Sequence, residues 1–241
     1  MRFLILSDIH ANWEALEGVL ASAEGRWDRA VCCGDLVGYG ADPNACADWV
    51  RKNVSTVIRG NHDRACAGIE DLEWFNPIAR AAALWTQETL TSENTEYLRA
   101  LARGPAELDE FAMVHGSPLD EDEYIVGLEE ARELASYLPA PRCFFGHTHI
   151  QGGFEYRRNN LRALVGGDRV TPLDRDSWYF LNPGSVGQPR DGDPRAAYAL
   201  YDSDEDRVEL VRTPYDIITA QRKILAAGLP EPLALRLDIG M

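Results

Sequence analysis

Basic residues are scarce in this sequence: Lys and Arg together number 24 against 39 Asp and Glu, which gives a formal net charge of −15. Proteins that bind long nucleic acids neutralise the phosphates with a basic face, so this charge balance argues against such a partner. It does not exclude small phosphate substrates, because a bound metal ion can supply local positive charge. We interpret most of the carboxylates as solubilising surface groups.

Cysteine patterns typical of disulfides or of zinc sites are also missing. The five cysteines include no C-x-x-C pair, their number is odd, and Cys32, Cys33 and Cys143 lie inside apolar runs. They are therefore predicted to be small core residues in a reducing, cytoplasmic setting. No apolar run approaches membrane-spanning length, and the first ten residues, MRFLILSDIH, lack the apolar length and cleavage site of a signal peptide. We expect no membrane partner.

The length of 241 residues fits one large domain or two small ones. In the first half, continuous apolar runs alternate with helical patterns, which is typical of an α/β fold with a largely parallel sheet. The predicted strands are 3–7, 30–33, 55–59, 111–115 and 143–147, and the predicted helices are 12–23, 42–52, 77–103 (two helices, broken near Thr91), 128–137 and 215–227. After Gly152, short runs between turn residues suit antiparallel strands. We expect two packed sheets with helices outside.

Each predicted strand of the first half ends in a polar cluster. The clusters are Asp8-Ile9-His10, Gly34-Asp35, Gly60-Asn61-His62-Asp63, His115-Gly116 and Gly146-His147-Thr148-His149. All five histidines of the chain lie in these clusters. Because ligands of open α/β sheets bind at the carboxyl ends of the strands, the clusters predict a single site.

The side chains of this predicted site are imidazoles, carboxylates and one carboxamide, without thiolates. Such ligands suit a catalytic centre for Mn, Fe, Zn, Ni or Co, whereas Mg prefers all-oxygen coordination. They are too many for one ion, and two ions bridged by one carboxylate would use them all. Taken alone, the pair His147 and His149 could equally be solvated loop histidines, but the other clusters favour a metal site.

The motifs D-x-H, G-D, G-N-H-D, H-G and G-H-x-H, in this order over residues 8–149, resemble the calcineurin-like metallophosphoesterase superfamily. The stretch NPGSVGQPR (182–190) resembles its smaller bacterial and archaeal phosphodiesterase branch. This resemblance implies a single domain over residues 1–241 with the form of a four-layer αββα sandwich, in which helices lie outside two packed mixed sheets. It also implies two divalent transition-metal ions, most simply Mn, and hydrolysis of phosphodiesters by in-line attack of a hydroxide that bridges them.

Residue roles follow from the same resemblance, motif by motif. The implied ligands are Asp8, His10, Asp35 and His149 for the first metal and Asn61, His115 and His147 for the second, with Asp35 bridging the two. His62 is left to act on the substrate, as general acid to the leaving oxygen or as a stabiliser of the charged transition state. Asp63, which follows it, is predicted to orient His62 and hold its proton.

Substrate contacts are less strongly indicated. Asn12, Arg59 and Arg64 could reach a phosphate, but the alternatives are a helix N-cap for Asn12 and surface ion pairs for the arginines. Trp74, Phe75 and Tyr124 could wall a pocket for a ring, with core packing as the alternative. The stretch 182–185 either supports the metal loops from behind or forms a simple turn.

Three other functions compete with a phosphodiesterase. They are a serine/threonine protein phosphatase, a dinucleoside polyphosphate hydrolase, and a non-catalytic scaffold similar to the retromer subunit that has this fold but has lost catalytic residues. Neither segment 66–110 nor segment 117–141 carries a motif that identifies the substrate, and the native metal and oligomeric state are equally open. No motif position departs from the family pattern, and His62 is present. We therefore predict an enzyme that acts on a small phosphoester.

Overall fold

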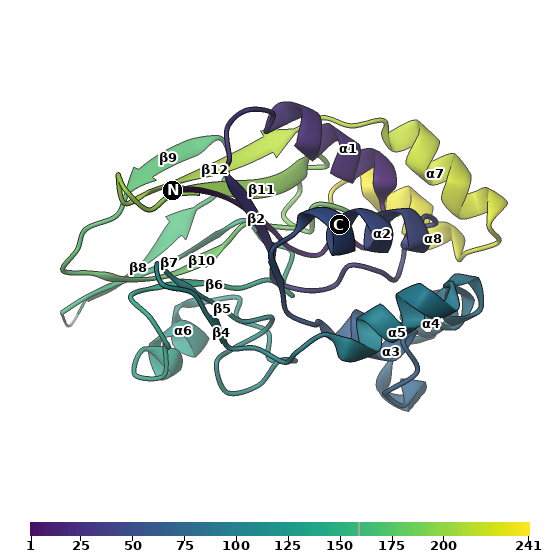
Figure 1. Cartoon of the computed structure of the whole chain (residues 1–241), viewed down its shortest axis with the longest axis horizontal. Coiled ribbons are helices and arrows are strands. Elements are labelled where there is room, and N and C mark those ends of the chain that lie inside the picture. Colours follow the sequence, from purple (N-terminus) through teal and green to yellow (C-terminus); the bar gives the residue numbers. More distant parts are fainter. Residues whose placement is uncertain (159) are drawn as a thin grey trace.

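The computed structural model describes residues 1–158 and 160–241. Over these residues the strands form two mixed sheets of six strands each, with helices around them, which confirms the predicted fold class (Figure 1). Helices α1 (Trp13–Ser22) and α7 (Ile217–Ala226) cover the outer face of one sheet, and α6 (Leu128–Leu134) covers that of the other. The two inner faces pack against each other.

The first sheet has the strand order β3-β2-β1-β11-β12-β9. Its strands are β1 (Arg2–Leu6), β2 (Arg29–Cys32), β3 (Thr56–Val57), β9 (Arg169–Pro172), β11 (Ala196–Asp202) and β12 (Arg207–Thr213). Strands β1, β2 and β3 run parallel, as their continuous apolar sequence predicts. Strand β11 pairs antiparallel with β1, with Leu200 opposite Leu4, so the C-terminal strands complete the sheet that the N-terminal strands begin.

The second sheet has the order β4-β5-β6-β10-β7-β8. Its strands are β4 (Ala106–Glu107), β5 (Ala112–Met113), β6 (Arg142–Phe144), β7 (Gly152–Arg157), β8 (Asn160–Val165) and β10 (Trp178–Asn182). Strands β5, β6 and β10 are parallel, and β7 and β8 continue the sheet as an antiparallel hairpin. Strand β6 ends at Phe144, three residues earlier than predicted, so His147 and His149 lie in the loop that follows it.

The remaining helices mostly follow the predicted pattern. They are α2 (Pro43–Asn53), α3 (Asn61–Cys66), α4 (Pro77–Thr89), α5 (Ser92–Ala100) and α8 (Glu231–Leu235), with the 3₁₀ turns η1 (Leu72–Trp74) and η2 (Arg236–Asp238). The predicted break near Thr91 is confirmed, because Thr91 caps α5 by accepting a hydrogen bond from the backbone N–H of Asn94 at 3.2 Å. No helix in the described part of the chain is both long and apolar enough to cross a membrane.

Aromatic side chains fill the space between the two sheets. Phe3 on the first sheet meets Phe111 and Phe144 from the second, and the rings of Phe3 and Phe111 cross edge to face at 4.9 Å. Each of these rings is fully buried, which favours the folded state by roughly 1.5–3 kcal/mol per side chain. All five cysteines are buried and free, which confirms the predicted burial of Cys32, Cys33 and Cys143. This packing fixes the two sheets relative to each other and hence the loops at their ends.

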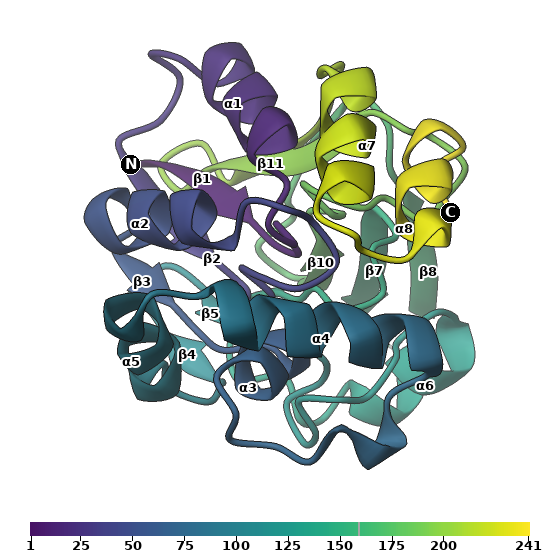
Figure 2. The ribbon, with the colours of Figure 1, turned by 90° about the vertical axis from the view of Figure 1, so that its right-hand side faces the viewer.

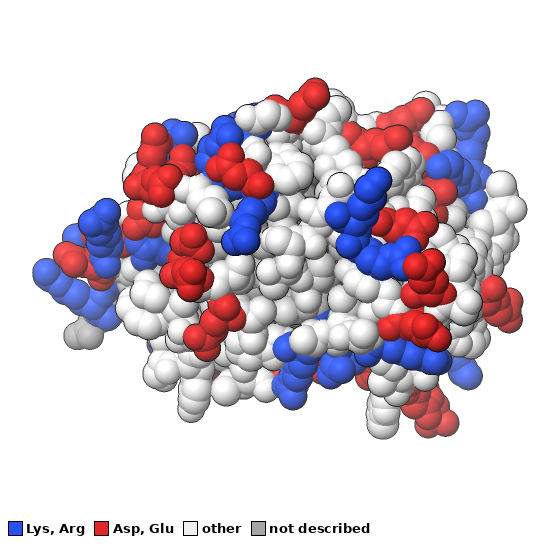
Figure 3. Space-filling model, viewed as in Figure 1, with Lys and Arg blue, Asp and Glu red and all other residues white. Residues whose placement is uncertain are grey.

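The carboxyl ends of β1, β2, β3, β5 and β6 point toward one end of the molecule. Figure 2 looks onto this end, where the loops lie between α7 and α8 on one side and α4 on the other. Acidic and basic side chains are intermixed over the face seen in Figure 3, without a patch of one sign. The polar clusters that the sequence predicts as a site therefore lie in the loops at the strand ends, and the face in Figure 3 shows no comparable concentration of charge.

Candidate metal centre

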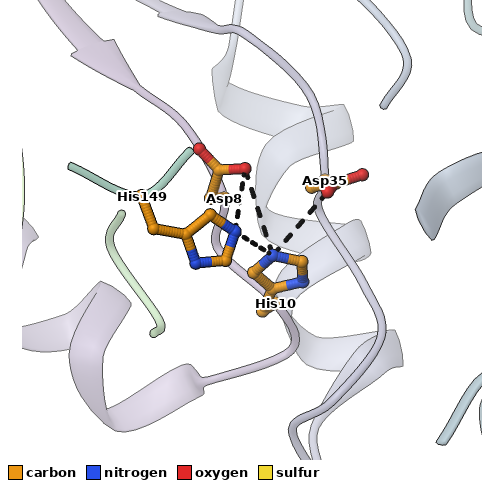
Figure 4. Close-up of side chains that lie close together, drawn as sticks. All are labelled: Asp8, His10, Asp35 and His149. Carbon is orange, nitrogen blue, oxygen red and sulfur yellow. Dashed lines mark hydrogen bonds and ion pairs between the residues drawn. The ribbon is translucent and has the colours of Figure 1, made fainter. Parts of the chain in front are cut away.

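Four side chains from three loops converge beyond the carboxyl end of β1 (Figure 4). The donor atoms of Asp8, His10, Asp35 and His149 all lie within 4.8 Å of one another, and all four residues are buried. Nε2 of His10 lies 3.0 Å from Nε2 of His149 and 3.7 Å from Oδ2 of Asp35. Nε2 of His149 lies 3.4 Å from Oδ1 of Asp8. Two carboxylates and two imidazoles aimed at one point suit a divalent transition-metal ion.

A second set of donors shares Asp35 with the first. Asp35, His115 and His147 also have donor atoms within 4.8 Å of one another, and Nε2 of His115 lies 3.3 Å from Oδ2 of Asp35. Asn61 joins this set, because its Oδ1 lies 3.3 Å from Nε2 of His115. The Oδ2 atom of Asp35 is buried and has no hydrogen-bond partner among the described residues. A cation on either side would satisfy this oxygen, so the residues present fit a pair of metal ions.

Backbone carbonyls hold the imidazoles in position. The Nδ1 atoms of three histidines donate to carbonyl oxygens: His10 to Val37 at 3.1 Å, His115 to Cys33 at 2.7 Å and His149 to Gln188 at 2.6 Å. These bonds fix the proton on Nδ1 and leave Nε2 as the ligand atom. His147 has the opposite arrangement, since its Nε2 donates to the carbonyl of Asp122 at 3.0 Å and Nδ1 is left.

The backbone at the ligands is strained. Five non-glycine residues of the two sets have positive φ, a left-handed conformation that non-glycine residues seldom adopt. They are Asp8 (52°), His10 (48°), Asp35 (54°), His147 (66°) and His149 (59°). Each such residue costs on the order of 1–3 kcal/mol, and strain of this kind clusters at functional sites. Beside Asp35, a Cβ atom on Gly60 would overlap the Asp35 carboxylate, so only glycine fits there.

Burial and neighbouring charges set the protonation of the cluster. Burial raises the pKa of Asp8, but His149 and His115 outweigh it and hold that pKa below its usual range. Burial lowers the pKa of His147 to about 3 and that of His10 well below its usual value, so both rings are neutral, the form that binds metals. Burial also lowers the pKa of His115, but Asp35 outweighs it and raises this pKa to about 10. A metal ion at this position competes with that proton.

His62 lies beside the two ligand sets rather than within them. Its ring centre is 5.0 Å from that of His10 and 4.3 Å from that of Tyr39, and its Nδ1 has no hydrogen-bond partner among the described residues. A Cβ atom on Gly38, whose φ is +87°, would come within 2.7 Å of that Nδ1, so glycine is required to admit the ring. His62 also lines a cavity of about 250 Å³ that opens next to Asn61.

The predicted role of Asp63 needs correction. Its buried carboxylate accepts hydrogen bonds from four backbone N–H groups at 2.8–3.3 Å and makes none with the ring of His62. The donors are Asp35, Leu36, Val37 and Gly60. Asp63 therefore holds the loop that carries Asp35 against the start of α3, and we replace the predicted orienting of His62 with this positioning role.

The three predicted phosphate contacts have other partners. Oδ1 of Asn12 accepts the N–H of Ala15 at 3.1 Å, so Asn12 is the N-cap of α1, the alternative that the sequence offered. Arg59 makes two hydrogen bonds to Glu121, at 3.1 and 2.9 Å. Arg64 is paired with Glu70, Glu121 and Asp122. We therefore replace the substrate-binding interpretation of both arginines with the fastening of segment 120–123.

The segments between the motifs also have defined places. Nδ2 of Asn182 donates to the carbonyl of Gly146 at 3.1 Å, and Oγ of Ser185 donates to the carbonyl of Asp8 at 2.8 Å, so this stretch supports the metal loops from behind. Trp74, Phe75 and Tyr124 line the same cavity as His62, and Trp74 is 91% exposed. These aromatic residues are thus walls of the cleft, although Phe75 also packs on the core.

Sequence reasoning missed three residues near the centre. Tyr39 packs against both His10 and His62, while Gln188 and Arg190 lie in the loop behind His149. The only signals in the sequence are the short G-Y-G after the G-D motif and the end of NPGSVGQPR. Neither signal states which side chain faces the ligands.

The comparison with known proteins agrees with this geometry. A sequence model described as the calcineurin-like phosphoesterase superfamily domain matches residues 1–206. The uncharacterized protein MJ0912 of Methanocaldococcus jannaschii is 36% identical over 245 residues, covering 98% of this chain and 97% of that protein.

Two crystal structures match the fold over nearly the whole of both chains. A metallophosphoesterase from Sphaerobacter thermophilus has a TM-score of 0.88 at 40% identity, covering 100% of this chain and 99% of that one. The hypothetical protein PH1004 from Pyrococcus horikoshii has a TM-score of 0.78 at 22% identity, covering 100% and 98%. As its motifs predict, the chain belongs to the calcineurin-like phosphoesterase superfamily.

Proposed function

We propose that this protein is a metal-dependent phosphodiesterase that uses two divalent ions, with Mn preferred. The observation that carries the two-ion part is the place of Asp35, whose Oδ2 lies 3.7 Å from Nε2 of His10 in one ligand set and 3.3 Å from Nε2 of His115 in the other. A carboxylate common to two ligand sets is what a pair of bridged ions requires.

Each part of the site then has a chemical task. Held by these side chains, the ions would polarise the phosphoryl oxygens and lower the pKa of the water that attacks phosphorus in line. Val37, Cys33 and Gln188 keep three imidazoles aimed at the ions through their carbonyl oxygens. His62 faces the cleft beside them and donates a proton or a hydrogen bond to the leaving oxygen.

The shape of the cleft supports a diester over a monoester. Two cavities share Tyr39 and Asn76 as lining residues, and His62 lines one of them. One, of about 250 Å³, extends past Trp74 and Tyr124, and the other, of about 470 Å³, lies against the C-terminal residues. A phosphodiester carries one substituent for each side, whereas a monoester would leave one side empty. Cavities of this size favour a small substrate, consistent with the acidic charge of the chain.

Hydrolysis of two nitrophenyl esters tests the proposal. The protein is stripped of metal, loaded with Mn and assayed on bis(4-nitrophenyl) phosphate and 4-nitrophenyl phosphate, and we expect kcat/KM to be at least tenfold higher for the diester. A preference for the monoester, or for a phosphopeptide assayed in parallel, would support a phosphatase instead. The variant Asp35→Asn should lose both ions and activity, whereas Asp109→Asn, an exposed control, should keep both. A wild-type protein that binds no metal and hydrolyses nothing would support the scaffold.

A further inference from the structure

Two arginines converge on one neutral oxygen beside the metal centre. Nη2 of Arg190 and Nη1 of Arg236 both donate to Oε1 of Gln188, at 3.0 and 3.2 Å. The two nitrogens therefore lie no more than about 6 Å apart, a separation at which two positive charges repel in a partly buried site. Over residues 1–158 and 160–241, neither guanidinium has a carboxylate oxygen within 4.0 Å, in contrast to Arg59 and Arg64.

This positive charge is unusual in a chain with a net charge of −15. Nε of Arg190 is buried and has no hydrogen-bond partner among the described residues. Burial and the neighbouring Arg190 both lower the pKa of Arg236. Guanidinium groups present planar donors that match the oxygens of a phosphate. The pair therefore forms a place where an anion would relieve the repulsion and fill the free donor.

The pair borders the metal centre. The backbone N–H of Arg190 donates to the carbonyl of His149 at 3.1 Å. The guanidinium carbon of Arg190 lies 5.7 Å from the ring centre of Tyr39, and that ring lies 4.7 Å from the ring of His10. Arg190 and His10, a member of the first ligand set, therefore pack against the same tyrosine ring.

Arg236 borders a space that is open to a ligand. Arg236 and Tyr39 line the cavity of about 470 Å³, and Tyr39 also lines the cleft beside His62. A group that Arg236 holds in this cavity would therefore be a neighbour of the reacting phosphate rather than that phosphate itself. Arg236 comes from η2, at the end of the C-terminal segment that lies beside the loops in Figure 2.

We propose that Arg190 and Arg236 bind a second phosphate of the substrate, next to the phosphate that is hydrolysed. This inference rests on the proposed function and narrows its substrate to esters that carry more than one phosphate. Two guanidinium groups could also bind the reacting phosphate, so the test distinguishes binding of that phosphate from binding of a second phosphate. Gln188 acts as a positioning residue, because its side chain gathers both arginines while its carbonyl oxygen holds His149.

A pair of substrates with the same leaving group provides the first test. The 4-nitrophenyl ester of thymidine 5′-monophosphate has one phosphate, and the ester of thymidine 5′-triphosphate on its terminal phosphate has three; both release nitrophenolate. In Arg236→Gln, KM should rise at least tenfold more for the triphosphate ester than for the monophosphate ester. The control Arg222→Gln removes an exposed arginine of α7 whose guanidinium bonds to Ile218 and Thr219 of its own helix, and it should leave both KM values unchanged.

Either of two results would overturn the second-phosphate subsite. Equal rises in KM for both esters would assign the arginines to the reacting phosphate, and no rise for either would show that they bind no part of the substrate. Either result would refute the second-phosphate subsite without refuting the proposed phosphodiesterase activity, which is measured separately.

The variant Gln188→Glu separates binding from structure. It has nearly the same shape but places a carboxylate between the two guanidinium groups, so the melting temperature should be unchanged or higher while KM for the triphosphate ester rises. If the arginines are only structural, the melting temperature rises and the ratio of the two KM values stays at its wild-type value, which contradicts the proposal. Because this variant keeps both arginines and the backbone that holds His149, a folding defect does not explain a loss of binding.

Binding of inorganic pyrophosphate gives a readout without catalysis. Calorimetric titration of the full chain before metal loading should show binding that weakens at least tenfold in Arg236→Gln and persists in Arg222→Gln. A protein that binds pyrophosphate in this way but hydrolyses no phosphoester would refute the proposed function and retain the subsite. If the protein is an active phosphodiesterase but its affinity for pyrophosphate does not depend on Arg236, the proposed function is retained and the subsite is refuted.

Discussion

Replacing Asp63 by asparagine should destabilise the protein strongly. The Asp63 carboxylate is fully buried and accepts four backbone N–H groups, two on each oxygen. Oδ1 accepts from Leu36 and Val37, and Oδ2 accepts from Asp35 and Gly60. Asparagine fits the same space but accepts on one oxygen only. The two N–H groups on the other side would then face an NH₂ group and lose their acceptor.

The magnitude follows from these two lost bonds. Burial and the neighbouring Asp35 raise the pKa of Asp63 to about 7, so the carboxylate is fully charged only above that pH. A hydrogen bond to a charged group contributes about 1.5–3 kcal/mol, so at pH 8 or above the free energy of unfolding should fall by about 3–6 kcal/mol. For a chain of this size, each kcal/mol lowers the melting temperature by about 2–4 °C. We therefore expect Asp63→Asn to melt about 6–24 °C below the wild type.

Calorimetry and denaturant unfolding of the metal-free protein measure this change, with Asp109→Asn as the exposed control that should melt with the wild type. Metal affinity should fall as well, because the loop that carries Asp35 loses its anchor. If Asp63→Asn instead melted within a degree of the wild type and lost a hundredfold in kcat, the positioning role would be refuted. The sequence-based role, in which Asp63 orients His62, would then stand.

Four other outcomes follow from the same structure. Elemental analysis should find two ions per chain in the wild type and one in His115→Ala, and a chelator should abolish activity that Mn restores better than Mg. His62→Ala should retain both ions while kcat falls by about 10²–10⁴, more for an alkoxide than for a nitrophenolate leaving group; an equal loss for both would remove His62 from the acid role. Burial raises the pKa of Glu121, but Arg59 and Arg64 outweigh this effect and leave the pKa below its usual value. The ionised Glu121 side chain therefore stabilises the fold above the pKa of an unfolded glutamate, and this stabilisation is lost as the pH falls. Glu121→Gln should therefore be less stable than the wild type at pH 7 but lose less stability on acidification, and parallel pH curves for the two proteins would count against this.

The convergence of the candidate ligands could be predicted from sequence because their types and order are a local property of the chain. Each ligand follows an apolar run, and parallel strands bring such positions to one end of a sheet. The strained φ values of Asp8, Asp35 and His147 are not visible in such a pattern, and α3 and α8, with six and five residues, are too short to give a helical period.

The partners of the arginines could not be predicted, for a physical reason. Arg59 and Glu121 are 62 residues apart, and Arg236 is 48 residues from Gln188, so their contacts depend on how loops and the C-terminal segment pack. Residue type alone does not distinguish between two interpretations of an arginine near a phosphate site, a ligand contact and an ion pair. Here the structure gives Arg59 and Arg64 carboxylate partners and leaves Arg190 and Arg236 without them within the described ranges.

The fastening of segment 120–123 should make the two proposed metal positions unequal in their response to ionic strength. The carbonyl of Asp122 holds His147, while the side chain of Asp122 is paired with Arg64 on α3, the helix that begins with Asn61. Asp122 is partly exposed, and dissolved salt screens such pairs within about 8–10 Å at moderate concentration. The first ligand set is held by buried backbone bonds that salt does not reach. Rising salt should therefore loosen the second metal before the first, so that one fold contains a tightly held ion and an exchangeable one.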